Sequence, residues 1–199
     1  MDTSENKRRG TVGRKTKETD IHLDLVLDGG GRAEIDSGVP FLDHMLTLFT
    51  VHGFFDLKLK AEGDTEIDDH HTVEDIGICF GLAISKALGD KSCIARYGSC
   101  YLPMDETLAR VVLDISNRPY LHYDVSVKEQ KLGTFDTFLC KEFFRAVCQH
   151  GGLTLHIDLL HGENGHHILE AIFKGFGRAL DSATSELQIT GSLSSKGCL

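Results

Sequence analysis

A five-residue signature occurs twice in the chain, as His70-His71-x-x-Glu74 and again as His166-His167-x-x-Glu170. On a helix, residues four apart share a face, while adjacent residues diverge by about 100°. His70 and Glu74 can therefore hold one ion while His71 points elsewhere, and the same holds for the second copy. Imidazole and carboxylate groups at this spacing predict a metal site.

The simplest arrangement of the two copies crosses them. One ion is then held by His70, Glu74 and His167, and the other by His166, Glu170 and His71. A single histidine pair on a helix is usually an ordinary solvated face. Its repetition in equivalent places favours a duplicated fold with two metal ions.

The repeat extends beyond the signature. The two copies stand 96 residues apart (166 − 70), and Gly81 aligns with Gly177 at the same offset. Upstream, an offset of 98 aligns His52-Gly53 with His150-Gly151 and also places His44 on Glu142. We therefore expect one further ligand from each half, His44 and Glu142, which gives each ion four protein ligands.

Each half is predicted to contain two strands, a helix, a strand and a second helix. Alternating apolar residues indicate the strands, Pro40 opens a helix and Gly89 ends one. The first half is expected to have its elements at 21–27, around Ile35, and at 41–52, 55–59 and 71–88. The second half is expected to have them at 111–115, 120–127, 137–149, 153–159 and 168–187. The pattern predicts an α+β fold that duplicates a ββαβα half, with antiparallel sheets.

Composition restricts the class of protein. A chain of 199 residues with 41% hydrophobic content can bury one sizeable core. The net charge of −9 argues against a general nucleic-acid binder, and no apolar run is long enough to cross a membrane. The six cysteines show no C-x-x-C spacing, so disulfides and thiolate metal sites are not expected. We expect a cytoplasmic enzyme without a nucleic-acid or membrane partner.

Residues 1–13 are expected to form a mobile arm because they are rich in lysine and arginine and lack apolar periodicity. A nucleic-acid-binding arm is the less favoured alternative. Residues 14–199 are expected to form one domain, made of two repeats (about 14–92 and 93–187) and a C-terminal tail, 188–199, that binds substrate.

Several motifs together resemble the imidazoleglycerol-phosphate dehydratase family, and the resemblance covers about residues 14–199. These motifs are Phe41–Leu46, Asp69–Asp75, Pro103–Glu106, His166–Lys174 and Ser194–Lys196. The resemblance implies a duplicated fold similar to ribosomal protein S5 domain 2, with two sheets and helices packed between them. It also implies a monofunctional hydro-lyase of histidine biosynthesis that converts D-erythro-imidazoleglycerol phosphate to imidazoleacetol phosphate and water.

The family uses two Mn(II) ions per active site, and the chemistry explains why. The proton is lost from a carbon that has no adjacent carbonyl. An imidazolate that bridges two ions can expel the hydroxyl on the attached carbon and form a diazafulvene, which makes the next carbon acidic. Nitrogen and oxygen ligands suit manganese, although zinc, iron and cobalt remain alternatives.

The resemblance implies two ligand sets. One ion is held by His44, His71, His166 and Glu170, and the other by His70, Glu74, His167 and Glu142. Glu142 departs from the many family members that have histidine there, and the alternative is that Glu142 is a surface helix residue. Whether the ligands cross within one chain or between neighbouring chains stays open.

The resemblance also implies the groups that act on substrate. Glu18 matches the family's acid/base glutamate, and His71 and Glu170 join it as catalytic residues. The expected substrate-binding residues are Glu18, His44, His52, His70, Arg96, Arg118, His166, Lys174, Ser194, Ser195 and Lys196, of which the cations suit a phosphate. Leu48 replaces a glutamine that touches substrate in many members. Asp105 and Glu106 are either structural carboxylates or site residues.

The family assembles trimers into a 24-subunit shell that metal supports, which implies the same assembly here. Two alternative functions remain from the residues alone. The first is a di-metal hydrolase that attacks a phosphate ester, and the second is a metal-storing or nucleic-acid-binding module.

Overall fold

The computed structural model describes residues 7–188, 191, 193 and 194. The first half contains β1 (Arg9–Lys15), β2 (Thr19–Val26), β3 (Ala33–Asp36), α1 (Pro40–Gly53), β4 (Asp56–Gly63) and α2 (His70–Leu88). The second half contains β5 (Tyr97–Met104), β6 (Thr107–Asp114), β7 (Tyr120–Asp124), β8 (Lys131–Leu132), β9 (Phe135–Asp136), α3 (Leu139–Gly151), β10 (Thr154–His161) and α4 (Gly165–Thr184).

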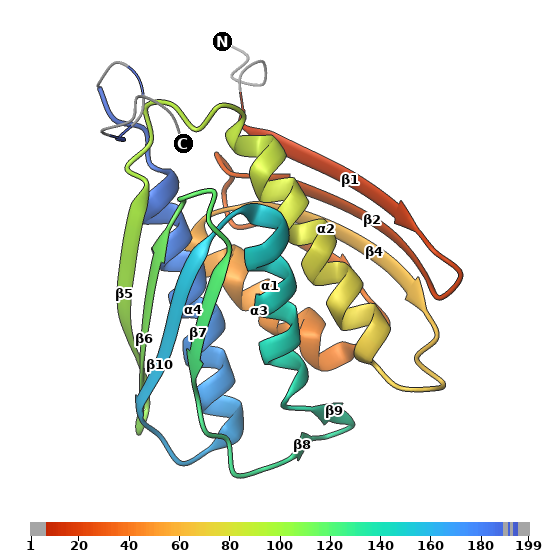
Figure 1. Ribbon diagram of the computed structural model, residues 1–199. Helices are drawn as coiled ribbons and strands as arrows, with labels where there is room; N and C mark the ends of the chain where they lie inside the picture. The colour runs from red at the N-terminus through yellow and green to blue at the C-terminus, as the bar shows by residue number, and fades with distance from the viewer. Residues whose placement is uncertain (1–6, 189–190, 192, 195–199) are drawn as a thin grey trace.

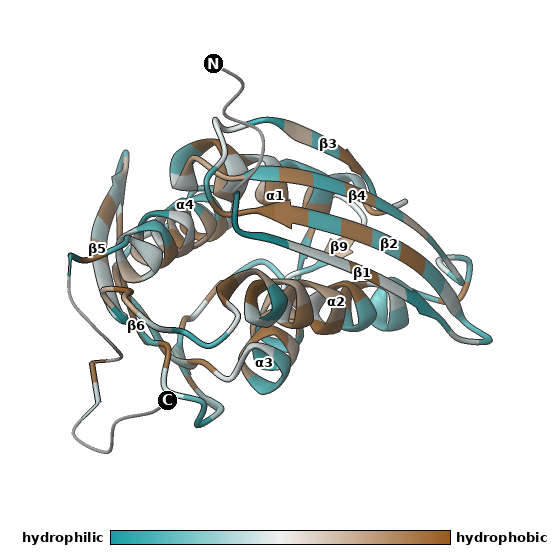
Figure 2. Cartoon of the chain, turned by 90° about the horizontal axis from the view of Figure 1, so that it is seen from above, coloured by the Kyte–Doolittle hydropathy of each residue, from teal (hydrophilic) through white to brown (hydrophobic). Residues whose placement is uncertain are grey.

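Two four-stranded sheets enclose the four helices (Figures 1 and 2). Their strand orders are β1-β2-β4-β3 and β5-β6-β10-β7, so the predicted duplication is confirmed. The expectation of antiparallel sheets is wrong for two pairs, β3 with β4 and β7 with β10, which are parallel. A helix connects the strands of each of these pairs, and such a crossover is what a parallel pair requires.

The strand registers define how the halves correspond. Arg9 pairs with Val26 and Tyr97 pairs with Asp114, so the two hairpins stand 88 residues apart (97 − 9). From α3 to the middle of β10, each residue stands 98 positions after its equivalent in α1 or β4. The ten additional residues lie between β7 and α3, where only the second half has the β8–β9 hairpin.

Strands β1 and β5 were not predicted, because each carries a glycine where an inward-facing apolar residue would reveal a strand. A Cβ on Gly10 would lie 1.9 Å from the Ala83 carbonyl oxygen of α2, and one on Gly98 would lie 1.8 Å from the Ala179 oxygen of α4. The expected mobile arm is therefore wrong for residues 9–13, which belong to β1. Residues 1–6 of that arm lie outside the described residues.

The helices pack in pairs that join the halves, α1 with α4 and α2 with α3. Both crossings are tight: a Cβ on Gly177 would lie 2.6 Å from the Phe49 oxygen, and one on Gly81 would lie 2.6 Å from the Val147 oxygen. Phenylalanine rings fill the space between, and the rings of Phe49 and Phe176 are 5.3 Å apart. These crossings fix the side chains of α1 relative to those of α4.

Both histidine pairs lie in the first turn of a helix, His70-His71 in α2 and His166-His167 in α4. The side chain of Asn164 accepts hydrogen bonds from the backbone N–H groups of His166 and His167, which caps α4. This cap places the start of α4 three residues before the predicted Ile168. Within the described ranges, no helix combines the length and the apolar character needed to span a membrane.

Candidate metal centre

Helices α1 and α4 bring three of the predicted ligands together. Oε1 of Glu170 accepts hydrogen bonds from Nε2 of His44 at 2.9 Å and from Nε2 of His166 at 3.1 Å. One ligand atom from each of the three residues lies within 4.8 Å of the other two. Two imidazole nitrogens and one carboxylate oxygen at this separation fit a divalent cation.

The electrostatics keep Glu170 ionised. Burial opposes its negative charge, but hydrogen bonds from Lys174, His44 and His166 outweigh burial and lower its pKa to about 2. Nζ of Lys174 lies 2.6 Å from Oε2 of Glu170. The carboxylate is therefore a ready acceptor for a cation at neutral pH.

In the second predicted ligand set, the two glutamates pair with an arginine of the same chain. Nε2 of His70 lies 3.7 Å from Oε2 of Glu74. Arg145 forms ion pairs with Glu142 and, at 3.7 Å, with Glu74. Oε2 of Glu142 is buried and has no hydrogen bond of normal geometry. Two carboxylates from α2 and α3 thus share one exposed guanidinium where a metal ligand set was predicted.

The remaining two histidines do not join these groups within one chain. Nδ1 of His71 donates to Oδ2 of Asp64 at 2.9 Å, and Nδ1 of His167 donates to Oε2 of Glu106 at 2.8 Å. The hydrogen bond with Asp64 raises the pKa of His71, and the one with Glu106 raises that of His167. In return, His167 holds the pKa of Glu106 far below its usual range.

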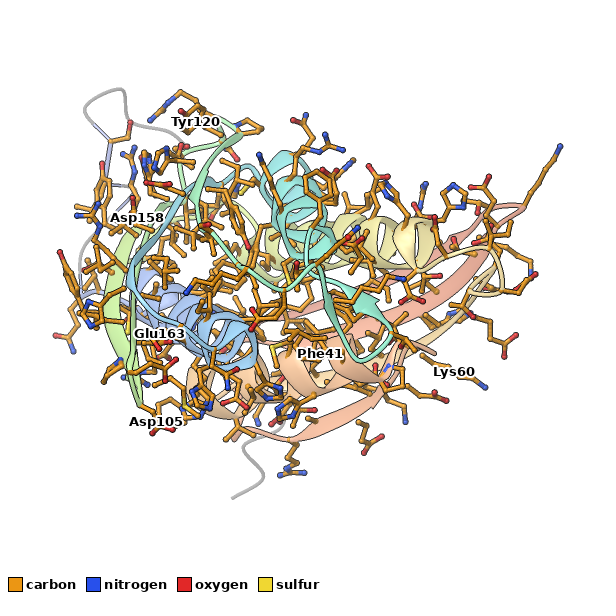
Figure 3. All side chains as sticks on the ribbon, turned by 90° about the horizontal axis from the view of Figure 1, so that it is seen from below. Phe41, Lys60, Asp105, Tyr120, Asp158 and Glu163 are labelled. Atoms are coloured by element: carbon orange, nitrogen blue, oxygen red, sulfur yellow. The ribbon has the colours of Figure 1, made fainter. Side chains whose placement is uncertain are left out.

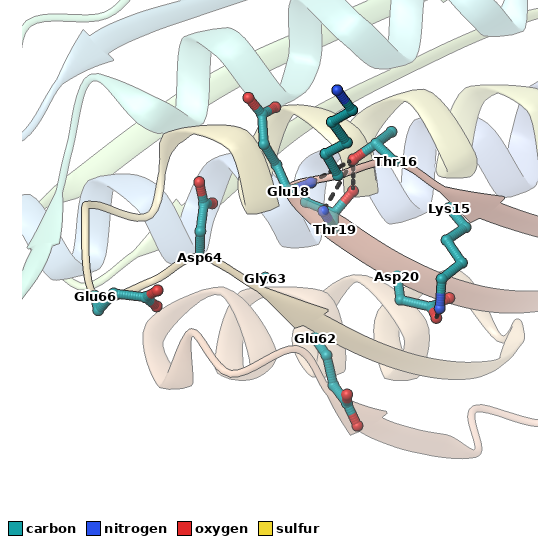
Figure 4. Close-up of a pocket in the computed structure, with 10 residues that line it drawn as sticks. Lys15, Thr16, Glu18, Thr19, Asp20, Glu62, Gly63, Asp64 and Glu66 are labelled. Carbon is teal, nitrogen blue, oxygen red and sulfur yellow. Dashed lines mark hydrogen bonds and ion pairs between the residues drawn. The ribbon is translucent and has the colours of Figure 1, made fainter.

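Glu18 lies in the turn between β1 and β2, beside His71. Its Oε2 is 3.9 Å from Nδ1 of His71, and its side chain is 54% exposed. Glu18 and Asp64 line a pocket of about 390 Å³. Figure 4 shows both carboxylates extending from neighbouring segments on the same side of this pocket, whereas Glu62 points the other way.

The cations predicted to bind phosphate fall into two groups. Lys174 lies beside Glu170. Burial, and to a smaller extent the positive charge of Lys174, lowers the pKa of His52. Arg96 and Arg118 instead share Asp114, at 2.7 and 3.4 Å. Arg96 also donates to the backbone oxygen of Leu193 in the C-terminal tail.

These two groups of cations lie at different levels of α4, with Lys174 in its middle and Arg96 at its C-terminal end. The backbone N–H of Arg96 donates to the oxygen of Ala183, nine residues beyond Lys174 on the same helix. At 1.5 Å per residue, the two positions are about 14 Å apart along the helix. Of the tail residues predicted to bind substrate, Ser194 is described, and Ser195 and Lys196 lie outside the described residues.

A second group of possible metal ligands was not predicted from the sequence. His122 and Asp124 of β7 lie beside β10, where Asp158 pairs with Asp124, and one ligand atom from each lies within 4.8 Å of the others. Asp158 already accepts a hydrogen bond from Arg110 at 3.1 Å. Asp158 lies well away from Asp105 and Glu163, which mark the other end of the sheet near the start of α4 (Figure 3).

Sequence reasoning missed Asp64 and Arg145 and left Glu106 undecided. Asp64 stands seven residues before His71, beyond a loop, so no helical spacing links them. Arg145 is three residues after Glu142, a spacing that also occurs on ordinary solvated helices. Leu48 packs against the hydrophobic core.

Comparisons with known proteins identify the family of the chain. The sequence profile described as "Imidazoleglycerol-phosphate dehydratase" matches residues 37–180. A protein of that name from Desulfotalea psychrophila is 68% identical over 195 residues, which cover 98% of each chain. Another, from Syntrophobacter fumaroxidans, is 61% identical over 194 residues, covering 97% of this chain and 98% of the relative.

Solved structures are similar over most of the chain. The crystal structure of imidazoleglycerol-phosphate dehydratase from Staphylococcus aureus has a TM-score of 0.81 and 48% identity, and the match covers 89% of this chain and 99% of that one. The Pyrococcus furiosus structure, described as IGPD in complex with (S)-C348, has a TM-score of 0.83 and 41% identity, with 94% and 100% covered.

Proposed function

The chain belongs to the imidazoleglycerol-phosphate dehydratase family and is a hydro-lyase of histidine biosynthesis, and we propose that it completes its active site with residues from a neighbouring copy of itself. The observation that carries this proposal is the group of His44, His166 and Glu170, which supplies three donors while the expected fourth, His71, lies with Asp64. Family membership rejects the di-metal hydrolase and the nucleic-acid-binding module.

The proposed first ion is held by His44, His166 and Glu170, with His71 of a neighbouring copy as the fourth ligand. Nitrogen and oxygen donors without a thiolate suit Mn(II), and we propose two such ions per active site. When bound, the ions act as Lewis acids that stabilise negative charge on the imidazole of the substrate. Glu170 accepts hydrogen bonds from both histidines, which orients their Nε2 atoms toward one point.

The proposed second ion is held by His70, Glu74 and Glu142, with His167 of a neighbouring copy. Glu142 is buried although it is charged, and its Oε2 is paired with the exposed Arg145; this burial supports a ligand role rather than that of a surface helix residue. Arg145 neutralises the carboxylate pair when no ion is bound, and it has to turn outward when one binds. Its 59% exposed side chain leaves it room to do so.

Glu18 is the proposed acid/base. Its carboxylate is exposed in the pocket beside His71, so Oε2 can accept the proton from the substrate carbon or return it to a product atom. The carboxylate of Asp64, also in this pocket, already accepts a hydrogen bond from Nδ1 of His71. His71 and Glu170 complete the catalytic set by holding the substrate's ring in place with the ions.

The proposed phosphate site combines Lys174 and His52 of one copy with Arg96, Arg118 and the tail residues Ser194, Ser195 and Lys196 of another. The support is the separation of about 14 Å along α4 between Lys174 and the helix end that Arg96 contacts, which is wider than one phosphate group. Arg118 keeps a 68% exposed side chain, available to a dianionic ligand.

We extend the proposal to the assembly and the compartment. Shared sites require an oligomer, and the family's 24-subunit shell of trimers is the one we propose. The phosphorylated substrate is charged and does not cross membranes unaided, so we place the enzyme in the cytoplasm, where such a metabolite is made.

The test is turnover of imidazoleglycerol phosphate by chelator-treated protein, with and without added Mn(II), following the ketone product. We expect product only with metal, and two bound Mn(II) per chain by metal analysis. Glu18→Gln should bind the same metal and lose at least about 100-fold in kcat. Release of inorganic phosphate instead of the ketone, or turnover without any metal, would contradict the proposal.

A further inference from the structure

The duplication puts a carboxylate at the same place in both hairpins. Glu18 directly precedes the first residue of β2, Thr19, and Glu106 directly precedes the first residue of β6, Thr107. Their separation, 88 residues, is that of the two hairpins. Glu18 and Glu106 are therefore equivalent positions of the two halves, each beside the second histidine of a signature.

A second pair of carboxylates is also equivalent. Glu62 of β4 pairs with Asp20, and His161 of β10 pairs with Leu108, 88 residues after Asp20. Two residues further along the chain, just after these strands end, come Asp64 and Glu163. Each half thus has a carboxylate in the hairpin turn and another just after the central strand.

The two halves use these carboxylates in opposite ways. In the first half the strand-end carboxylate, Asp64, takes Nδ1 of His71 at 2.9 Å, and the hairpin carboxylate, Glu18, stays at 3.9 Å. In the second half the hairpin carboxylate, Glu106, takes Nδ1 of His167 at 2.8 Å. Glu163 contributes its backbone N–H, which donates to Oε1 of Glu106 at 3.2 Å.

Exposure separates the two first-half carboxylates. The side chain of Asp64 is only 15% exposed, and its backbone is fixed by donating to the oxygen of Glu18 and accepting from the N–H of Ile67. The side chain of Glu18 is 54% exposed. The carboxylate that hydrogen-bonds the histidine is thus the less exposed of the two, and the more exposed one, Glu18, lies farther from the ring.

We propose that Asp64 is a positioning residue with two effects. It fixes His71 through Nδ1, so that Nε2 is the nitrogen presented to a metal ion, and by occupying the ring it keeps Glu18 free for the substrate. Glu106 does the first of these for His167 and is therefore not free itself. The other carboxylate of that turn, Asp105, lies 3.8 Å from Nε2 of His167, the nitrogen that would face the metal. This inference rests on the proposed metal and acid/base roles.

Two other predicted metal ligands of the chain also present Nε2, rather than Nδ1, to the proposed site. His44 and His166 both direct Nε2 toward Glu170. A neutral imidazole whose Nδ1–H donates to a carboxylate keeps its lone pair on Nε2, and such a partner also strengthens the ring as a ligand. All four histidines would then use the same atom.

The experiment measures Mn(II) affinity without substrate, from the electron paramagnetic resonance signal of the free ion, and kcat separately. Asp64→Ala should lower the affinity for one of the two Mn(II) ions by about 10- to 100-fold and lower kcat at least as much. Asp64→Asn keeps an oxygen that accepts from Nδ1–H and should stay within a few-fold of wild type in affinity. The matched control is Glu163→Ala at the equivalent position, which should leave both quantities unchanged.

The freeing of Glu18 is tested by a double variant. In Asp64→Ala, Glu18 can turn onto His71, so adding Glu18→Gln should lower Mn(II) affinity further. In the wild-type background, Glu18→Gln should leave affinity unchanged. Equal effects of Glu18→Gln on affinity in both backgrounds would overturn this part of the inference.

Wild-type affinity and kcat in Asp64→Ala would overturn the whole inference, provided that wild type binds two ions and forms the ketone. Failure of wild type to do either would instead count against the proposed function. If metal-free Asp64→Ala does not fold, Glu106→Ala repeats the affinity test from a partly exposed turn. Unchanged affinity in Glu106→Ala then overturns the inference.

Discussion

At the scale of single residues, charge balance distinguishes the two candidate ion sites. Glu170 meets one lysine and two imidazoles, whereas Glu74 and Glu142 share one arginine. The first group is a single carboxylate already surrounded by donors. The second is a pair of carboxylates with one exposed cation, so it gains more from a divalent ion.

Glu170 should make stability depend on pH in acid. Its pKa is about 2 when folded and about 4.5 when unfolded, so its contribution is complete above pH 4.5 and is lost as pH falls toward 2. The shift corresponds to about 3 kcal/mol, as an order of magnitude. In metal-free protein, the difference in free energy of unfolding between wild type and Glu170→Gln should therefore shrink below pH 4.5, as measured by urea unfolding. A difference that stays constant from pH 7 to pH 3 would contradict this assignment.

Arg145→Met should destabilise the protein only when metal is absent. Without the guanidinium, the buried Glu142 loses its cation, and the thermal midpoint of metal-free protein should fall by about 3–6 °C, or about 1–2 kcal/mol. Saturating Mn(II) should remove most of this loss. The matched control is Arg9→Met, an equally exposed arginine paired with Asp24 on the outside of sheet β1-β2-β4-β3, whose effect should be the same with and without metal.

The residues that helical spacing relates could be predicted, and those related through loops could not. His166 and Glu170 are four apart on one helix, and their contact follows from the pitch. His44 could be assigned as a further ligand because the alignment of the two halves places it on Glu142. The contact of His71 with Asp64 depends on the path of the loop from β4 to α2, which no periodicity encodes.

At the scale of elements, the glycines at the helix crossings control the site. A Cβ on Gly177 would lie 2.6 Å from the Phe49 oxygen and 3.2 Å from the Gly53 nitrogen, so alanine there forces α4 away from α1. Gly177→Ala should lower the thermal midpoint by several degrees and also weaken Mn(II) binding, because His44 and Glu170 lie on the separated helices. Isothermal titration with Mn(II) measures the second effect.

Two alanine variants serve as comparisons for Gly177→Ala. Gly81→Ala strains the equivalent crossing of α2 and α3, because its Cβ would lie 2.6 Å from the Val147 oxygen. This variant should lower the affinity for the other Mn(II) ion instead. Gly13→Ala in β1 would place Cβ 3.6 Å from the His22 ring, an ordinary contact, and should change neither quantity appreciably. Equal metal affinity in Gly177→Ala and Gly13→Ala would contradict the role given to the crossing.

The elements that sequence predicted are those with a buried apolar face. Strand β2 alternates buried with partly or fully exposed residues, and Figure 2 shows hydrophobic and hydrophilic residues alternating along β2 and β4. Strand β1 has only Gly10 and Val12 buried, and outward-facing Arg9 and Lys15 pair with aspartates of β2. Such an edge strand is held by backbone pairing and ion pairs, and composition alone resembles a solvated arm.

At the scale of the whole molecule, shared sites predict complementation. Inactive Glu170→Gln and His71→Asn chains, dissociated with a chelator and reassembled together with Mn(II), should recover about a quarter of wild-type turnover, because random mixing makes that share of interfaces intact. Glu170→Gln mixed with His166→Asn should recover nothing, since those two residues touch within one chain. Equal recovery in both mixtures would contradict a site shared between chains.

Metal should also hold the assembly together. If His71 and His167 bind ions on neighbouring copies, removing the ions removes contacts between subunits. Light scattering of chelator-treated protein should show a smaller particle, and Mn(II) should restore the larger one. A particle that keeps its full size without metal would contradict this role.

The pairing of α1 with α4 and of α2 with α3 has a consequence for synthesis on the ribosome. Each half covers only part of its helices with its own sheet, because each helix of the first half also packs on one from the second. A nascent chain that has released α1 must wait for α4, more than one hundred residues later, on the order of ten seconds at usual translation rates. During that interval the face of α1 that α4 will cover is exposed, which makes the emerging first half a natural client of chaperones.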